Sequence, residues 1–237
     1  MSVNPPPGVN LDGLLFDKDG TLFDFHGTWN VWAFGLITDL SEGDTGQAEA
    51  IARAIMYDLQ TRRFLPGSPA IAGTNREAAE CLVEVLPGRS IAEIEHHLML
   101  TSADAPLVAT VPLAEFLDAL ALRGLALGVM TNDTEYGARA HLGAAGVVEK
   151  FHFIAGFDSG HGAKPAPEPL LAFASQLALA PARVAMVGDS THDLIAGRRA
   201  GMQTIGVLTG MAGADELAPY ADVILPDIGH IPAWLDP

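Results

Sequence analysis

The chain has 237 residues, and 49% of them are hydrophobic, which is enough for one large domain or a core with a small second domain. Its formal net charge is −16 with only 13 lysines and arginines, which argues against nucleic acid or an anionic membrane as a partner. The one cysteine, Cys81, excludes an intramolecular disulfide and a cysteine-based zinc site, and it fits a reducing compartment.

Residues 1–11 are predicted to form an extended N-terminal tail. Three consecutive prolines, 5–7, favour an extended backbone. The segment has neither the cationic start nor the apolar run of a signal peptide, and no apolar run in the chain reaches membrane-spanning length. We therefore expect a cytoplasmic protein.

The first predicted strand, Gly13–Phe16, is followed directly by charged residues. Its apolar residues are typical of a buried parallel strand, and Asp17, Lys18 and Asp19 follow directly. Residues two apart in an extended segment point to the same side, so the two aspartates are predicted to share a site from which Lys18 points away. Two close carboxylates need a cation or a proton, and oxygen ligands without histidine or cysteine indicate Mg²⁺. The alternative is a turn with two solvated aspartates.

A helical segment without strands is predicted from about residue 27 to residue 109. Trp29 and Trp32 lie at helical spacing, and we expect them to pack within this segment. Arg62 and Arg63 stand side by side in a chain poor in cations, which makes them candidates for gripping a substrate. Three helices are predicted to begin with capping boxes, formed by Asp44 with Gln47, Thr74 with Glu77, and Ser90 with Glu93.

Strands and helices alternate from residue 110 onward, which predicts a parallel sheet covered by helices on both faces. Residues 12–24 and 110–237 would form this α/β core domain, and residues 25–109 would be a helical domain inserted after the first strand. Strands are predicted over 125–130, 151–155, 184–187, 204–207 and 222–225; helices are predicted over 111–122, 134–145, in a segment ending near residue 178, and over 193–200.

Polar residues follow the predicted strands where each strand ends. The carboxyl ends of parallel strands meet at one edge of a sheet, so these side chains are expected to converge. Carboxylates, a hydroxyl and a lysine suit a phosphoryl group, because a metal and a lysine neutralise its oxygens while a carboxylate attacks phosphorus. The converging residues are Asp17, Asp19, Thr131, Lys164, Asp189 and Asp193.

Four motifs in this order resemble those of the haloacid dehalogenase superfamily. They are DKDGT at 17–21, Thr131 followed by Asn132, Lys164 within GAKPAPEP, and GDSTHD at 188–193. The resemblance implies a Rossmann-like parallel sheet, and the insertion resembles the superfamily's type C1 helical cap. Within the superfamily, GDSTHDLIAGRRAG at 188–201 is most similar to phosphoglycolate phosphatase-like proteins.

The resemblance implies a nucleophile and a Mg²⁺ site. Asp17 would form an aspartyl-phosphate, while Asp19 would protonate the leaving alkoxide and then activate water. Mg²⁺ would be held by Asp17, by the backbone carbonyl of Asp19 and by Asp189. Asp193 would lie nearby, either as a ligand through water or as a partner of Lys164.

The resemblance also implies how phosphate would be bound. Thr131 and the amide of Asn132 would hold phosphate oxygens, and Lys164 would steady the nucleophile and the transferring group. Two positions depart from the usual pattern. Lys18 replaces a residue that is more often apolar, with little effect expected on the chemistry, and Phe25 stands where serine is common.

These features predict a Mg²⁺-dependent hydrolase of small phosphate monoesters, with phosphoglycolate or a similar soluble metabolite as substrate. Haloacid dehalogenation on the same fold is an alternative, although Asp19 and Asp189 argue against it. Phosphomutase activity is another, because it shares Asp17 and Asp19. A non-catalytic protein that binds a phosphorylated metabolite is the alternative from a different class.

Overall fold

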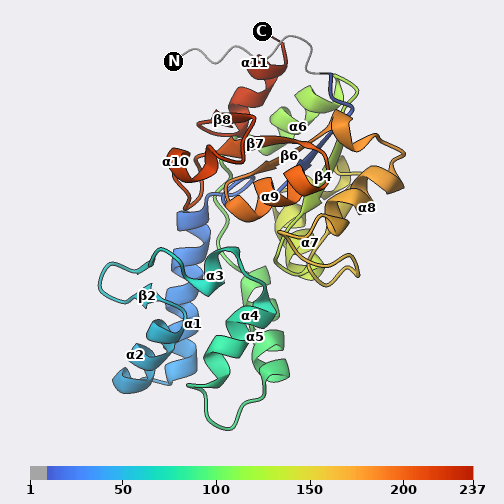
Figure 1. The fold of residues 1–237 in the computed structure, drawn as a ribbon. Helices are drawn as coiled ribbons and strands as arrows, with labels where there is room; N and C mark the ends of the chain where they lie inside the picture. The colour runs from blue at the N-terminus through green and yellow to red at the C-terminus, as the bar shows by residue number, and fades with distance from the viewer. Residues whose placement is uncertain (1–9, 237) are drawn as a thin grey trace.

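A six-stranded parallel sheet forms the centre of the computed structural model, which describes residues 10–236 (Figure 1). The strand order is β5-β4-β1-β6-β7-β8, and every neighbouring pair is parallel. This confirms the predicted α/β fold class. The strands are β1 (Gly13–Phe16), β4 (Ala126–Met130), β5 (Phe153–Ala155), β6 (Val184–Gly188), β7 (Gln203–Val207) and β8 (Val223–Leu225).

Strand β1 lies in the middle of the sheet, with all four residues buried, and the alternation of its side chains defines two packing layers. Leu14 and Phe16 belong to one hydrophobic cluster together with residues of α6, α7 and α11, whereas Leu15 belongs to another with residues of α8 and α9. Helices therefore cover both faces, as a parallel sheet requires. The helices of this part are α6 (Leu113–Ala121), α7 (Glu135–Ala144), α8 (Glu168–Gln176), α9 (Thr191–Arg199), α10 (Ala214–Leu217) and α11 (Ile231–Leu235).

Between β1 and β4 the chain forms a separate helical part, drawn below the sheet in Figure 1. Buried residues from Phe25 to Leu98 make a third hydrophobic cluster of their own. The boundaries proposed for a cap at 25–109 stay a prediction. The helices are η1 (His26–Asn30, a π-helical turn), α1 (Val31–Ser41), α2 (Thr45–Ala54), α3 (Pro69–Ala72), α4 (Asn75–Val83) and α5 (Ile91–Ala103).

The helical part also contains a small antiparallel pair of strands, β2 (Tyr57–Asp58) and β3 (Arg63–Phe64). The prediction that this segment has no strand is wrong on this point. Two residues are too few to show the alternation by which a strand is recognised in sequence. Here the pairing turns Tyr57 and Phe64 inward, where their rings pack 5.2 Å apart.

Two of the three predicted capping boxes are present, those of Thr74 with Glu77 and Ser90 with Glu93. The third is formed only in part. Asp44 accepts a hydrogen bond from the backbone N–H of Gln47, but the Gln47 side chain donates to the carbonyl of Val85 instead of turning back.

Among residues 10–236, no helix combines the length and apolar character needed to cross a bilayer. The predicted N-terminal tail falls mostly on residues 1–9, outside the described part of the chain.

Candidate active site

The carboxyl ends of three adjacent strands, β4, β1 and β6, open on one cavity. Asp17 follows β1, Thr131 follows β4 and Asp189 follows β6. The structure thus brings together side chains that lie up to 176 positions apart, as the topology of a parallel sheet predicts. All seven residues predicted for the core of the site line this cavity: Asp17, Asp19, Thr131, Asn132, Lys164, Asp189 and Asp193.

Lys164 forms the cationic centre of the cavity. Its Nζ lies 2.7 Å from Oδ1 of Asp17 and 2.6 Å from Oδ1 of Asp193, and its side chain is buried. Burial alone would lower the pKa of this lysine, but the two carboxylates outweigh burial and raise the pKa above its ordinary value. Lys164 is therefore a permanently charged group placed beside Asp17.

Three buried carboxylates form a cluster in the cavity. Asp17, Asp189 and Asp193 each offer an oxygen, and these oxygens lie within 4.8 Å of one another. Burial, followed by the neighbouring Asp193 and Asp19, raises the pKa of Asp17 to about 7, although Lys164 acts in the opposite direction. Burial and the charges of Asp193 and Asp17 likewise raise the pKa of Asp189.

One ammonium group cannot balance three buried carboxylates, so the cluster favours a bound cation. The donors are all carboxylate oxygens, without histidine or cysteine, which is the donor set that Mg²⁺ prefers. The residues present therefore fit a magnesium ion.

The loop that carries Lys164 is fastened to the end of β4 by Asn132. The side-chain amide of Asn132 donates to the carbonyl of Lys164, and the N–H of Lys164 donates to Oδ1 of Asn132, both at 2.9 Å. This reciprocal pair fixes the distance between two segments 32 residues apart.

Asp193 is held in place by the start of α9. Ser190 caps this helix in a capping box: its backbone N–H donates to Oδ2 of Asp193 at 3.0 Å, and its hydroxyl oxygen accepts from the N–H of Asp193. The Ser190 hydroxyl also donates to Oδ2 of Asp193 at 2.7 Å. The other oxygen of Asp193 accepts from Lys164. The helix begins at Thr191, two residues before the predicted start, and the S-x-x-D pattern at 190–193 is a signal that would have located it.

Lys18 does not point away from both carboxylates, which corrects the prediction from strand alternation. Its buried Nζ lies 2.7 Å from Oδ2 of Asp19 and 3.2 Å from Oδ2 of Asp133. The regular strand ends at Phe16, so the alternation that was assumed for residues 17–19 no longer applies there. Lys18 thus holds the carboxylate of Asp19 in place through an ion pair.

His141 completes the surroundings of Lys18. Its Nδ1 lies 2.9 Å from the Lys18 ammonium, and its Nε2 lies 2.7 Å from the carbonyl of Ser102 in α5. Burial and the charge of Lys18 lower the pKa of His141, which favours the neutral ring. Because an ammonium only donates, Nδ1 accepts and Nε2–H donates to Ser102. The contact connects the sheet's edge to the helical part, and no local sequence signal indicates it.

Asp189 is packed against two glycines that sequence reasoning did not single out. A Cβ atom at Gly20 would lie 2.4 Å from its Oδ2, and one at Gly210 would lie 1.6 Å from the same atom. Thr209 donates to the carbonyl of Gly20 at 2.6 Å, so the two glycine loops are joined. The absence of side chains at both positions leaves room for the carboxylate.

The structure does not bring Arg62 and Arg63 to the cavity, which corrects their assignment as candidates for gripping the substrate. Arg62 occupies a left-handed backbone conformation, and its guanidinium lies 4.0 Å from the ring centre of Phe34. Arg63 is exposed because its neighbour Phe64 takes the inward position of β3.

Aromatic residues from the helical part line the cavity instead. Phe25, Trp29 and Trp32 all face it, and the two tryptophan rings pack edge to face with their centres 5.1 Å apart. The tryptophans were predicted to pack within the helical part, and they do contact its hydrophobic cluster while also lining the cavity.

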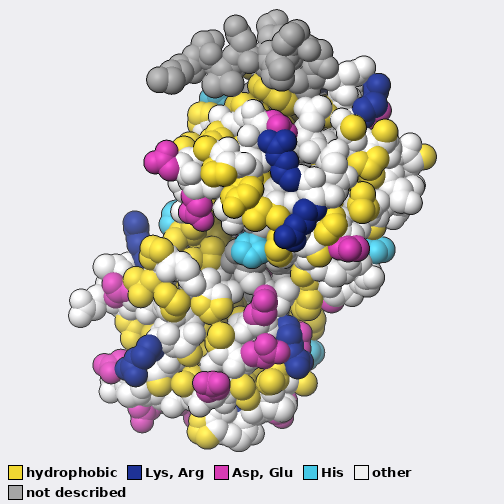
Figure 2. Space-filling view, in the orientation of Figure 1, with side chains coloured by type: hydrophobic (Ala, Val, Ile, Leu, Met, Phe, Trp, Pro, Cys, Tyr) yellow, Lys and Arg dark blue, Asp and Glu magenta, His cyan; other side chains and the backbone are white. Residues whose placement is uncertain are grey.

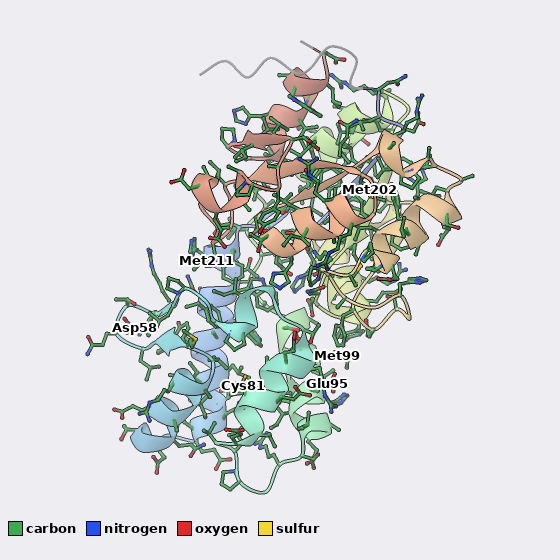
Figure 3. The ribbon with its side chains drawn as sticks, in the orientation of Figure 1. Asp58, Cys81, Glu95, Met99, Met202 and Met211 are labelled. Carbon is green, nitrogen blue, oxygen red and sulfur yellow. The ribbon has the colours of Figure 1, made fainter. Side chains whose placement is uncertain are left out.

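Cys81 lies on α4, away from the sheet (Figure 3). It is half-buried, and burial followed by nearby glutamates raises the pKa of its thiol, which opposes formation of a thiolate.

Comparison with known families identifies the chain. Residues 11–201 match the family model described as haloacid dehalogenase-like hydrolase. The chain belongs to this family. The match spans the first strand, the helical part and the segment carrying Lys164 and Asp193, and it therefore includes every residue placed in the cavity.

Named relatives of this haloacid dehalogenase-like hydrolase include phosphatases. The pyrophosphatase PpaX of Bacillus velezensis is 28% identical over 210 residues, which cover 89% of each protein. The phosphoglycolate phosphatase of Escherichia coli K12 is 35% identical, but over only 41% of this chain and 38% of the relative. The structure of CbbY from Rhodobacter sphaeroides in complex with phosphate is similar with a TM-score of 0.74 at 20% identity, covering 96% of this chain and all of that one. At this identity the likeness shows the fold.

Proposed function

We propose that this hydrolase releases inorganic phosphate from small phosphate monoesters, with Mg²⁺ and through a phosphorylated Asp17. The observation that carries the proposal is the placement of Asp17 between a buried lysine and two further buried carboxylates. A carboxylate beside a fixed cation and a site for a second cation is suited to attack an anionic phosphoryl group.

Asp17 would act as the nucleophile through one carboxylate oxygen. Lys164, already 2.7 Å from that side chain, would neutralise charge on the transferring group. The hydroxyl of Thr131 and the amide of Asn132 would donate to phosphate oxygens. Mg²⁺, when bound by Asp17, Asp189 and the backbone carbonyl of Asp19, would neutralise phosphate charge, with Asp193 positioned beside it.

Asp19 would move the proton. It lines the cavity with part of its side chain exposed to it, whereas its partner Lys18 is fully buried. Asp19 would first protonate the leaving oxygen and then take a proton from the water that hydrolyses the phosphorylated Asp17. The helical part supplies the aromatic wall that limits the access of bulk water to these steps.

The test is phosphate release from p-nitrophenyl phosphate and a panel of small esters, with Mg²⁺ and with EDTA. We expect turnover that requires Mg²⁺ and that disappears in Asp17→Asn, while circular dichroism shows an unchanged fold. Acid quenching should trap a phosphorylated protein in the wild type only. Turnover that survives in Asp17→Asn would overturn the proposal.

A further inference from the structure

The cavity beside Asp17 is divided by chemistry into two sides. The sheet supplies the carboxylates and Lys164, whereas the helical part supplies mainly apolar surface. The apolar residues of this side are Phe25, Trp29, Trp32, Ala70, Ile71 and Ala78, and Gly73, Thr74 and Asn75 also line the cavity from the helical part. The phosphoryl group would occupy the charged side, so the rest of the substrate would face the apolar side.

A second, larger cavity adjoins the first. The first encloses about 70 Å³ and the second about 450 Å³, and both are lined by Lys164, Asp189 and His192. A cavity of several hundred cubic ångströms is the size that small-molecule ligands occupy. Its wall is formed by the loop before α3 and by the segment around Met211, which lies at the junction with the helical part (Figure 3).

Neither cavity offers a free cation for a second anionic group. Among the described residues, Lys164 is the one lysine or arginine that lines them, and it is already paired with Asp17 and Asp193. The imidazole of His192 is the remaining basic group. Glu77 and Glu216 add negative charge to the second cavity. Basic side chains on the face shown in Figure 2 are scattered rather than gathered into a patch.

We infer that the leaving group of the substrate is an uncharged alcohol or phenol with an apolar or aromatic body. This inference rests on the proposed phosphatase function. A leaving group that carries a carboxylate or a second phosphate would lose its hydrating water against the aromatic rings and would be repelled by the nearby carboxylates. Among the described residues that line the cavities, no lysine or arginine is free to offset this cost in binding free energy. An aromatic body would replace water against Trp29 and Trp32 and stack with them. Phosphoglycolate and pyrophosphate are therefore poor substrates.

The test uses two esters that differ only in a remote charge. Benzyl phosphate and 4-carboxybenzyl phosphate have the same ester linkage, so the chemical step is closely matched. We expect kcat/KM to be at least about tenfold higher for benzyl phosphate, which corresponds to about 1.4 kcal/mol. We expect both phosphoglycolate and pyrophosphate to fall below benzyl phosphate.

A charge placed on the apolar side should reverse the preference. Ile71 is half-buried, lines both cavities and lies outside the groups assigned to the chemistry. Ile71→Lys should raise kcat/KM for the carboxylated ester relative to benzyl phosphate by about tenfold. Ile71→Met is the matched control, because it has similar length without charge, and it should keep the wild-type ratio.

Binding to Asp17→Asn separates this inference from the proposed reaction. Titration calorimetry with this variant should show tighter binding of benzyl phosphate than of its carboxylated analogue, even if the wild-type protein hydrolyses neither ester. That combination would reject the phosphatase function and support the apolar leaving-group site. Equal binding of the two esters, or a preference for phosphoglycolate in turnover, would overturn the inference.

Discussion

The ammonium of Lys18 lies 2.7 Å from Oδ2 of its chain neighbour Asp19, and the lysine side chain is completely buried. Burial disfavours the charged lysine, but Asp19 and Asp133 outweigh it and raise its pKa. Asp19, the residue proposed to transfer the proton, is therefore held in place by the ammonium of Lys18, and Lys18 does not line the cavity. Lys18 in turn contacts Nδ1 of His141, and Nε2 of His141 contacts the carbonyl of Ser102 in the helical part.

Lys18→Met should slow phosphoryl transfer by about tenfold or more, because Asp19 would lose the contact that holds its carboxylate toward the cavity. The effect should be larger for an alkyl phosphate than for p-nitrophenyl phosphate, since the poorer leaving group depends more on protonation by Asp19. Single-turnover measurements of Asp17 phosphorylation would compare the two esters.

A matched control is Lys150→Met, which removes an ion pair with Asp118 at the surface. Equal losses with both esters in Lys18→Met would contradict a role in positioning Asp19. Removing one partner of a buried charge pair costs about 3 to 5 kcal/mol, so urea unfolding must confirm that the variant stays folded under assay conditions.

The positions of the chemical groups could be predicted because they depend on topology. Asp17, Thr131 and Asp189 each follow an apolar strand, and parallel strands bring such positions to one edge whatever lies between them. The two capping boxes at Thr74 and Ser90 could be predicted because each involves residues only three apart.

The surroundings of these groups could not be predicted, because they depend on packing between distant segments. His141 contacts Lys18 across 123 positions. Gln47 fits a capping box locally, but a tertiary contact with Val85 takes its side chain. Arg62 and Arg63 were singled out because the chain has few cations, but Arg62 lies next to β3 and Arg63 within it, and neither lines the cavities.

Stability without a cation should fall as pH rises through the carboxylate range. The pKa of Asp17 is raised from about 3.8 to about 7 in the folded protein, so the folded state binds this proton more tightly than the unfolded state. Between these two pH values the free energy of unfolding should therefore decrease with pH. At about 1.4 kcal/mol per pKa unit, the loss contributed by Asp17 is roughly 4 kcal/mol.

Urea unfolding in EDTA at pH 4.5 and pH 7.5 measures most of this loss. Asp17→Asn, which has no proton to release at this position, should show a weaker dependence on pH. Added Mg²⁺ should restore stability at pH 7.5 in the wild type, because the cation replaces the proton in balancing the cluster. A wild type that is equally stable in EDTA at both pH values would contradict the prediction.

Asp193→Ala should destabilise the protein more than Ser190→Ala does. Both substitutions break the capping box at the start of α9, which costs about 1 kcal/mol. Asp193→Ala also removes a carboxylate from Lys164 in a buried site, which should bring its total cost to about 3 kcal/mol or more. Chemical denaturation of both variants with bound Mg²⁺ compares them, and equal losses would show that the ion pair adds nothing beyond the cap.

Gly210→Ala should weaken Mg²⁺ binding. The new Cβ would fall 1.6 Å from Oδ2 of Asp189, so either the carboxylate or the loop must shift. Because Asp189 is a proposed metal ligand, the Mg²⁺ concentration for half-maximal activity should rise by about tenfold or more, with part of the maximal rate recovered at saturating Mg²⁺.

Gly213→Ala is the matched control, since a Cβ there meets no atom within 4 Å and its backbone has an ordinary negative φ of −83°. Calorimetric titration of Mg²⁺ provides a measurement independent of turnover. Wild-type Mg²⁺ affinity in Gly210→Ala would show that Asp189 is not a ligand whose position matters.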